Sequence, residues 1–191
     1  KTFDEYWAPE KTYYWPKDGY LTFAAYSPAG VKNVATIKYG ITHGVEIENY
    51  VVNTDPTKQI DLMLSNREVD ETSDKMEINK PAPYDGVQLT FSHVLSAIDF
   101  IVKTAKDYKT NDQYTITLKS ITIKNAFTTG TLTQFANAAT YDIDLTAIWS
   151  ARTAEGSYEV LSDTEITSAE TAITPDANIA DLVLLPQDLV H

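Results

Sequence analysis

The chain has 191 residues, no cysteine and a formal net charge of −12, with 27 acidic side chains against 15 Lys and Arg. Its length lets it bury roughly 70% of its unfolded surface, so a hydrophobic core forms without disulfide bonds, which the lack of cysteine excludes. The negative charge argues against binding to nucleic acid or anionic membranes, and no run is apolar enough for a transmembrane helix.

The N-terminal segment, residues 3–20, is crowded with aromatic side chains, and Tyr13, Tyr14 and Trp15 are consecutive within it. Such rings either form a surface that stacks against sugars or pack on the protein's own sheet, with Tyr hydroxyl and Trp N–H groups reaching water or backbone. These three residues are therefore the candidate stacking set of a carbohydrate-binding hypothesis.

Short alternating apolar patterns then predict a series of strands. Residues 20–26 form the first, residues 31–53 form two or three more with turns at Gly40 and at 43–44, and residues 59–66 form the next. Residues 68–85 are acidic, contain two prolines and predict a surface loop.

Residues 86–103 are the longest apolar-patterned run, and the fold is expected to be organised around them. The inward side chains change phase within the run, from the odd-numbered Val87, Leu89, Phe91 and His93 to the even-numbered Ile98, Phe100 and Val102. A one-residue shift turns the core face of a strand outward, so we expect two strands joined by a crossover at 94–97. The alternative is an amphipathic helix over 92–106. The predicted structural core here is Leu89, Phe91, His93 and Phe100.

A second phase-shifted strand is predicted at 114–124, followed by a hairpin around Gly130 and a strand from residue 141 toward Trp149. Residues 150–177 are rich in Ser, Thr, Glu and Ala, and predict a domain boundary near 147–155. The last predicted strand, 179–185, either belongs to an incomplete second domain or completes the first sandwich. The domain hypothesis is an N-terminal β-sandwich over 1–149, with a linker and the start of a second sandwich over 150–191.

Catalytic chemistry has little support in the sequence. His93 lies near Ser92, Ser96 and Asp99, but no nucleophile elbow is present, and its inward phase predicts a buried structural histidine. Asp142 and Asp144 share one strand face, where a solvated acidic surface is favoured over a calcium site. No catalytic, metal-binding or cofactor-binding residue is predicted, and no cofactor is expected.

An ordered series of segments resembles the fimbrillin family of Bacteroidetes, the fimbrial subunit proteins of the FimA-like and Mfa-like type. The segments are Tyr14-Trp15-Pro16, LTFAAYSP at 21–28, QIDLMLSN at 59–66, VQLTFSHVLSAIDF at 87–100, SITIKNAFTTGTL at 120–132 and LLPQ at 184–187. Their order and spacing cover nearly the whole chain.

The resemblance implies an all-β fold of two tandem transthyretin-like β-sandwiches, the second of them incomplete here. It further implies export to the cell surface as an outer-membrane lipoprotein, with the membrane reached only through a lipid anchor outside this sequence. Family maturation cuts after an arginine near the N-terminus. No arginine precedes Arg67, so the site would lie upstream of Lys1 or in the 66–80 loop, or this processing does not apply.

Three hypotheses of function follow. The first is a structural and adhesive fimbrial protein whose partners are other subunits, joined by donor-strand exchange, with a host protein or glycan as receptor; residues 87–93 and 179–185 are the candidate groove neighbours. The second is a surface carbohydrate-binding module that uses Tyr13, Tyr14 and Trp15. A hydrolase is a distant third, because no nucleophile or acid pair stands out.

Overall fold

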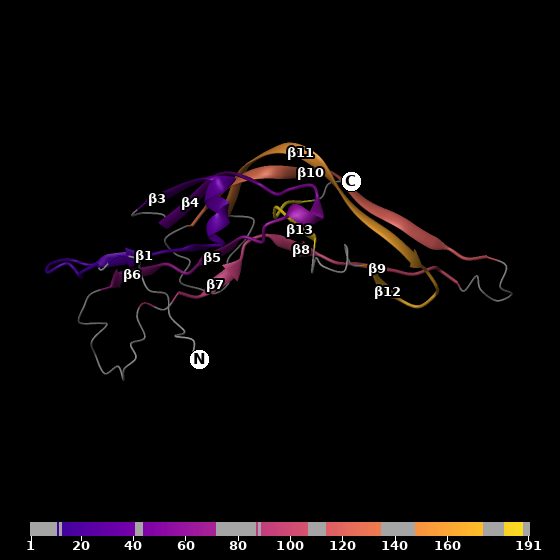
Figure 1. The fold of residues 1–191 in the computed structure, drawn as a ribbon, viewed down its shortest axis with the longest axis horizontal. Helices are drawn as coiled ribbons and strands as arrows, with labels where there is room; N and C mark the ends of the chain where they lie inside the picture. The colour runs from indigo at the N-terminus through magenta and orange to yellow at the C-terminus, as the bar shows by residue number, and fades with distance from the viewer. Residues whose placement is uncertain are drawn as a thin grey trace, which may run out of the picture.

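The computed structural model describes residues 11, 13–40, 44–71, 87, 89–106, 114–134, 148–173 and 182–188. This part of the chain is all-β, as predicted: its strands pair antiparallel, and two short 3-10 helices, η1 (Ala29–Asn33) and η2 (Pro56–Lys58), lie between them. The strands form two facing layers (Figure 1).

One layer is a four-stranded sheet in the order β11-β10-β4-β3. Its members are β3 (Thr36–Gly40), β4 (Gly44–Val51), β10 (Thr117–Thr133) and β11 (Trp149–Glu165). Strands β10 and β11 have 17 residues each and pair along nearly their whole length, whereas β4 pairs only with residues 129–133 of β10. The sheet is therefore four strands wide at one end and two strands wide at the other.

The facing layer consists of short strands. They are β1 (Leu21–Phe23) with β6 (Glu68–Glu71), the three-stranded set of β2 (Tyr26–Ser27), β5 (Met63–Ser65) and β7 (Phe91–His93), β8 (Ser96–Ile98) with β13 (Leu182–Leu184), and β9 (Phe100–Val102) with β12 (Thr171–Ile173). Figure 1 shows these short sets in a row that faces the four-stranded sheet.

The core between the layers is centred on Trp149, which is 2% exposed. Its ring lies 5.8 Å from that of Tyr50, and its indole N–H donates to the carbonyl of Val94 at 2.7 Å, so the sheet is tied to the facing layer. Gly130 lies against this ring: a Cβ there would come within 3.1 Å of Trp149 and 3.3 Å of Leu185. Gly130 thus allows Trp149 and Leu185 to pack closely against the strand, and the predicted hairpin around it is wrong, because β10 continues through this position.

The organising run divides as predicted at the crossover. Strand β7 ends at His93, β8 begins at Ser96, and Val94 and Leu95 between them are buried. The three strands of this run pair with three different partners, β5, β13 and β12. The alternative helix over 92–106 is wrong.

The predicted burial of His93 and Phe91 is also wrong. The His93 side chain is 68% exposed and Phe91 is 38% exposed, whereas Leu89 and Phe100 are half-buried. The register explains the error: Ser92 pairs with the buried Leu64, so the even-numbered face of β7 is the inner one. The odd-numbered residues of β7 therefore face outward, contrary to the prediction from the sequence pattern.

Two predictions for the C-terminal part are compared with the described strands. Residues 149–165, expected to begin a linker, form β11 and pair with β10 throughout. Within the predicted strand at 179–185, Leu182–Leu184 form β13, residues 179–181 lie outside the described residues, and the buried residues of β13 belong to the same hydrophobic cluster as Val45, Leu64 and Val94. This is the arrangement expected if the last strand completes the first sandwich. The predicted strand from residue 141 lies outside the described residues.

Candidate functional site

The described residues contain few side-chain clusters of the kind that bind metals or catalyse reactions. No group of three or more His, Asp or Glu side chains there is arranged to hold a metal ion, and none of their helices is long and apolar enough to cross a membrane. The Nδ1 atom of His93 lies 2.7 Å from Oδ2 of Asp61, and both side chains are largely exposed. Asp61 is 32 positions away, and no local sequence pattern indicates this pairing.

The features with potential for interaction are strand edges, and the longest is on β10. The last backbone contact of β10 with the β4 segment is the hydrogen bond from the Val52 N–H to the Thr128 carbonyl, 2.8 Å. Residues 117–127 continue past this point with β11 on one side and no strand of the described chain on the other. We call residues 117–125 of β10, together with 157–165 of β11, the two-stranded arm.

Burial decreases along β10 as the sheet narrows. Beside β4 the inward side chains of Ala126 and Leu132 are completely buried. In the two-stranded arm the inward side chains of Leu118, Ile121 and Ile123 are only half-buried. The apolar face of the arm is therefore incompletely covered.

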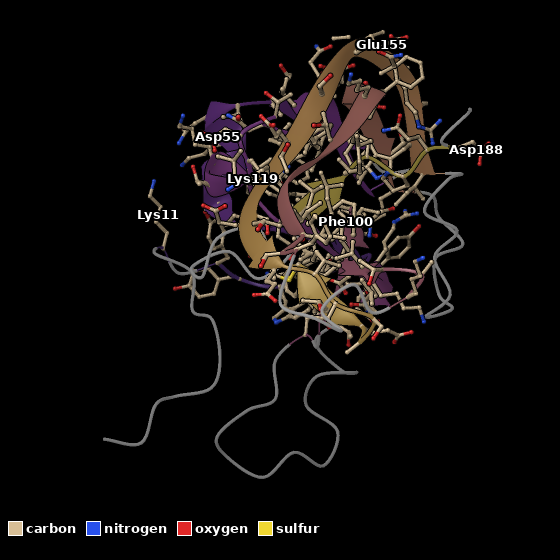
Figure 2. All side chains as sticks on the ribbon, turned by 90° about the vertical axis from the view of Figure 1, so that its right-hand side faces the viewer. Lys11, Asp55, Phe100, Lys119, Glu155 and Asp188 are labelled. Carbon is tan, nitrogen blue, oxygen red and sulfur yellow. The ribbon has the colours of Figure 1, made fainter. Side chains whose placement is uncertain are left out.

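Strands β9 and β12 face the arm across the sandwich. Phe100 and Val102 of β9 are half-buried in the same cluster as Ile121 and Ile123, and Figure 2 shows the β10–β11 ribbon curving over Phe100. The Ile166 N–H donates to the Ile116 carbonyl at 2.8 Å and continues the β10–β11 ladder, and the Thr104 N–H, which follows β9, donates to the Thr167 carbonyl, which follows β11, at 2.8 Å. Both layers are two strands wide at this end.

The outer edge of β11 differs from the edge of β10 in its backbone geometry and its charge. Its ladder with β10 is interrupted by register shifts, and Ala151 and Ala154 have positive φ angles of 46° and 53°. Acidic side chains at 155, 159, 163 and 165 are exposed along the strand. Bulges and charges of this kind protect edge strands against pairing.

The edge of β13 is closed by a side chain. The Val183 N–H donates to Oε1 of Gln59 at 2.9 Å, and Nε2 of Gln59 donates to the Val183 carbonyl at 3.0 Å. The Gln59 carboxamide thus pairs with β13 as a peptide group of a neighbouring strand would. Of the two predicted groove neighbours, the one at 179–185 is occupied at Val183.

The other predicted neighbour, 87–93, contains β7. Its pairing with β5 extends over three residues, and the adjacent Asn66 N–H and Val94 N–H donate to the carbonyls of Thr90 and Leu62. No strand of the described chain pairs with its second edge. With three residues, this edge offers much less ladder than β10 does.

Buried tyrosines support the wide end of the sandwich. The Tyr50 hydroxyl donates to the Ile60 carbonyl at 2.6 Å, and the Tyr158 hydroxyl donates to the Val52 carbonyl at 3.4 Å. Burial raises the pKa of Tyr158 to about 12, and burial together with the charge of Asp61 raises the pKa of Tyr50. Both phenols therefore stay neutral where β4 leaves the sheet.

The three residues predicted to stack on sugars differ in their exposure to solvent. Tyr13 and Tyr14 are 74% and 88% exposed, whereas Trp15 is half-buried with its ring 5.8 Å from that of Phe23. Trp15 packs on β1, and the two tyrosines are free to contact a ligand.

The described residues thus form an antiparallel β-sandwich in which residues 117–125 of β10 pair with β11 alone among the described strands. The chain belongs to the fimbrillin-like family, whose model matches residues 1–190. Members of such a family are fimbrial structural subunits at the cell surface, in agreement with the resemblance found in the sequence. No curated protein and no solved structure matches the chain.

Proposed function

We propose that the protein is a non-catalytic fimbrial subunit that adheres and assembles by exchange of a β-strand with other subunits. In such an assembly an extended segment of one subunit pairs with a free edge of the next, with ladder hydrogen bonds and alternate apolar side chains stabilising the contact. In this proposal the protein is exported and held at the outer membrane through a lipid anchor.

The observation that carries the proposal is the incomplete cover of the two-stranded arm. Apolar surface contributes about 25 cal/mol per Å² when it is removed from water, so half-buried Leu118, Ile121 and Ile123 leave part of that free energy unused. An additional strand would bury these side chains and satisfy free backbone groups at once. The family assignment supports the same conclusion, because fimbriae are polymers of such subunits.

The proposal is tested by following assembly of the purified protein over a wide concentration range, before and after limited proteolysis. Light scattering and electron microscopy are expected to show linear polymers whose amount rises with concentration. A protein that stays monomeric under all of these conditions would contradict the proposal.

A second candidate function, carbohydrate binding, is favoured by the exposure of Tyr13 and Tyr14. Exposed phenol rings stack on sugar faces, and their hydroxyl groups stay in water. Replacement of both by Ala should abolish binding to a glycan array, whereas Tyr39→Ala, at a ring that is 68% exposed on β3, should not. An array without hits for the unmodified protein would remove this candidate.

A further inference from the structure

We infer that His93 and Met63 form a binding site for a soft metal ion, Cu(I), on the outer face of the three-stranded sheet of β2, β5 and β7, and that Asp61 positions the His93 ring. The inference goes beyond the proposed function, because metal binding at this face requires neither assembly nor the exposed tyrosines.

The His93 ring is oriented by Asp61. Nδ1 of His93 lies 2.7 Å from Oδ2 of Asp61. An ionised carboxylate only accepts hydrogen bonds, so Nδ1 carries the proton, and in the neutral ring the lone pair is then on Nε2. Histidine ligands of metal ions have this arrangement, in which a carboxylate accepts from one ring nitrogen and the other nitrogen binds the metal. The contact with Asp61 therefore prepares Nε2 of His93 as a ligand.

The register of β5 and β7 places a second donor beside His93. Met63 pairs directly with His93, and the next pair is Leu64 with Ser92. Since Leu64 is buried in the core, Met63 and His93 belong to the opposite, outer face of the sheet. Residues directly opposite on antiparallel strands have Cβ atoms about 4.5–5.5 Å apart. One ion can therefore bind both Sδ of Met63 and Nε2 of His93, with bonds of about 2.3 Å to sulfur and 2.0 Å to nitrogen, as known for zinc.

The chemistry of the two donors selects the metal. A thioether is a soft ligand that favours Cu(I), and imidazole also binds copper. Cu(I) forms stable complexes at low coordination number, whereas Zn²⁺ in a structural site takes about four ligands and Ca²⁺ takes about six or more oxygens. No group of three or more His, Asp or Glu side chains in the described part of the chain is arranged to supply such a set. The pair of donors therefore suits Cu(I) better than zinc or calcium.

The site is open to solvent, so an ion reaches it without a change of fold. The side chains of His93 and Asp61 are 68% and 46% exposed, and Met63 is half-buried. The chain has a net charge of −12, which raises the concentration of cations near its surface. Because His93 and Asp61 are exposed, they can be replaced without loss of the core, and changes in metal affinity can be separated from unfolding.

Competition with a chromophoric chelator measures the affinity of the purified protein for Cu(I), supplied with ascorbate under nitrogen. His93→Leu and Met63→Leu each remove one ligand and should weaken Cu(I) binding by about 100-fold. Ser27→Ala is the matched control, because Ser27 pairs with Met63 from the other side, and it should leave the affinity unchanged. Zn²⁺ should bind at least about tenfold more weakly than Cu(I). Equal affinity of the unmodified protein and His93→Leu for Cu(I), or tighter binding of Zn²⁺, would overturn the inference.

NMR shows which residues hold the ion, since the chain contains three histidines and two methionines. Addition of Cu(I) should shift the assigned Hε1 signal of His93 and the ε-methyl signal of Met63 at the same point of the titration. A shift of only one of them, or of neither, would overturn the pair as the site.

The positioning role of Asp61 has its own readout. The ¹⁵N shifts of His93 should show the tautomer with the proton on Nδ1, and Asp61→Ala should lose this preference and weaken Cu(I) binding by about tenfold or more. The melting temperature is measured in parallel and should stay nearly unchanged. Unaltered tautomer and affinity in Asp61→Ala would show that Asp61 does not position the ring.

Discussion

Gln59 and Val183 are 124 positions apart in the sequence, yet the carboxamide of one pairs with both backbone groups of the other, at 2.9 and 3.0 Å. The same Nε2 atom also donates to the Asn53 carbonyl at 2.9 Å. One side chain thereby fixes the segment between β4 and β5 to the outer edge of β13.

The first prediction concerns this contact. Gln59→Leu keeps the volume but removes the donors and the acceptor, so we expect a loss of about 1–2 kcal/mol of unfolding free energy. The Val183 amide should exchange faster, measured by NMR, whereas the β8 amides keep their rates. Lys58→Ala, at the neighbouring exposed position, is the control, and an unchanged Val183 rate in Gln59→Leu would show that the side chain does not close the edge.

The second prediction concerns Gln134, which is 1% exposed and connects the two layers. Its Oε1 accepts from the Val45 N–H at 3.1 Å, and its Nε2 donates to the Ser65 carbonyl at 2.6 Å. Gln134→Leu leaves both groups buried and unpaired, so chemical denaturation should show a loss of about 2–4 kcal/mol.

The control is Gln187→Leu. Gln187 pairs with the Phe127 N–H and carbonyl at 2.7 and 3.0 Å, but it is only half-buried, so water replaces its hydrogen bonds. The expected loss is about 1 kcal/mol or less. A loss as large as that of Gln134→Leu would contradict the argument from burial.

The third prediction follows from the exposure of His93. A surface substitution away from special features changes stability by no more than about 0.5 kcal/mol, and the contact with Asp61 is a solvent-exposed hydrogen bond of small effect. We therefore expect His93→Leu and Asp61→Asn each to leave the melting temperature nearly unchanged. A large destabilisation by His93→Leu would restore the buried structural role that the sequence pattern suggested.

The fourth prediction is a loss of stability at high pH. In the folded protein the pKa of Tyr158 is raised to about 12 from an ordinary 10.0, so the folded state favours the neutral phenol. The resulting stability is complete below pH 10 and is lost as the pH rises from 10 toward 12, because the unfolded chain ionises first.

Tyr158→Phe removes this effect and should move the alkaline unfolding midpoint to higher pH, as followed by circular dichroism. Tyr13→Phe alters a ring that is 74% exposed and should not move the midpoint. Equal midpoints for both variants would exclude Tyr158 as a source of the alkaline transition.

The fifth prediction concerns proteolysis at the two arginines, Arg67 and Arg152. Arg67 is half-buried between β5 and β6, and the preceding Asn66 N–H donates to the Thr90 carbonyl at 2.9 Å. Arg152 lies within β11 and donates from Nε to the Pro186 carbonyl at 2.9 Å. An arginine-specific protease should therefore leave the native chain intact and cut the denatured chain at both sites, as judged by mass spectrometry.

Rapid native cleavage after Arg67 would contradict this prediction. It would also restore the maturation site in the 66–80 loop as an option. Such a cut would separate Val45, Ile47 and Tyr50 from the rest of the core, which the folded structure does not favour.

Several features of the fold were accessible from local pattern alone. Alternation with period 2 located most strands, and the predicted interruption at 94–97 coincides with the break between β7 and β8. The continuously apolar strand near residue 183 was predicted because a strand buried on both faces shows no alternation. The register shift between Leu118 and Ser120 was likewise visible as a phase change.

Other features depend on contacts that no local pattern encodes. The sequence pattern predicted a change of inner face from odd to even positions, but the pairing of Ser92 with Leu64 makes the even-numbered face of β7 the inner one, and this exposes His93. The polar composition of residues 150–165 resembled a linker because an edge strand of a narrow sheet has few buried positions. The candidate edge of β10 was missed because it is defined by where β4 stops.

The amino-acid sequence by itself determined the β class, the fimbrillin-like family and the position of the crossover, because each is written in the order and spacing of neighbouring residues. Only the tertiary structure decided which strand edges have a partner among the described residues. An edge is closed by contacts such as that between Gln59 and Val183, which are far apart along the chain. Local sequence cannot show which edges are closed, because the backbone hydrogen-bonding groups are the same in every residue except proline.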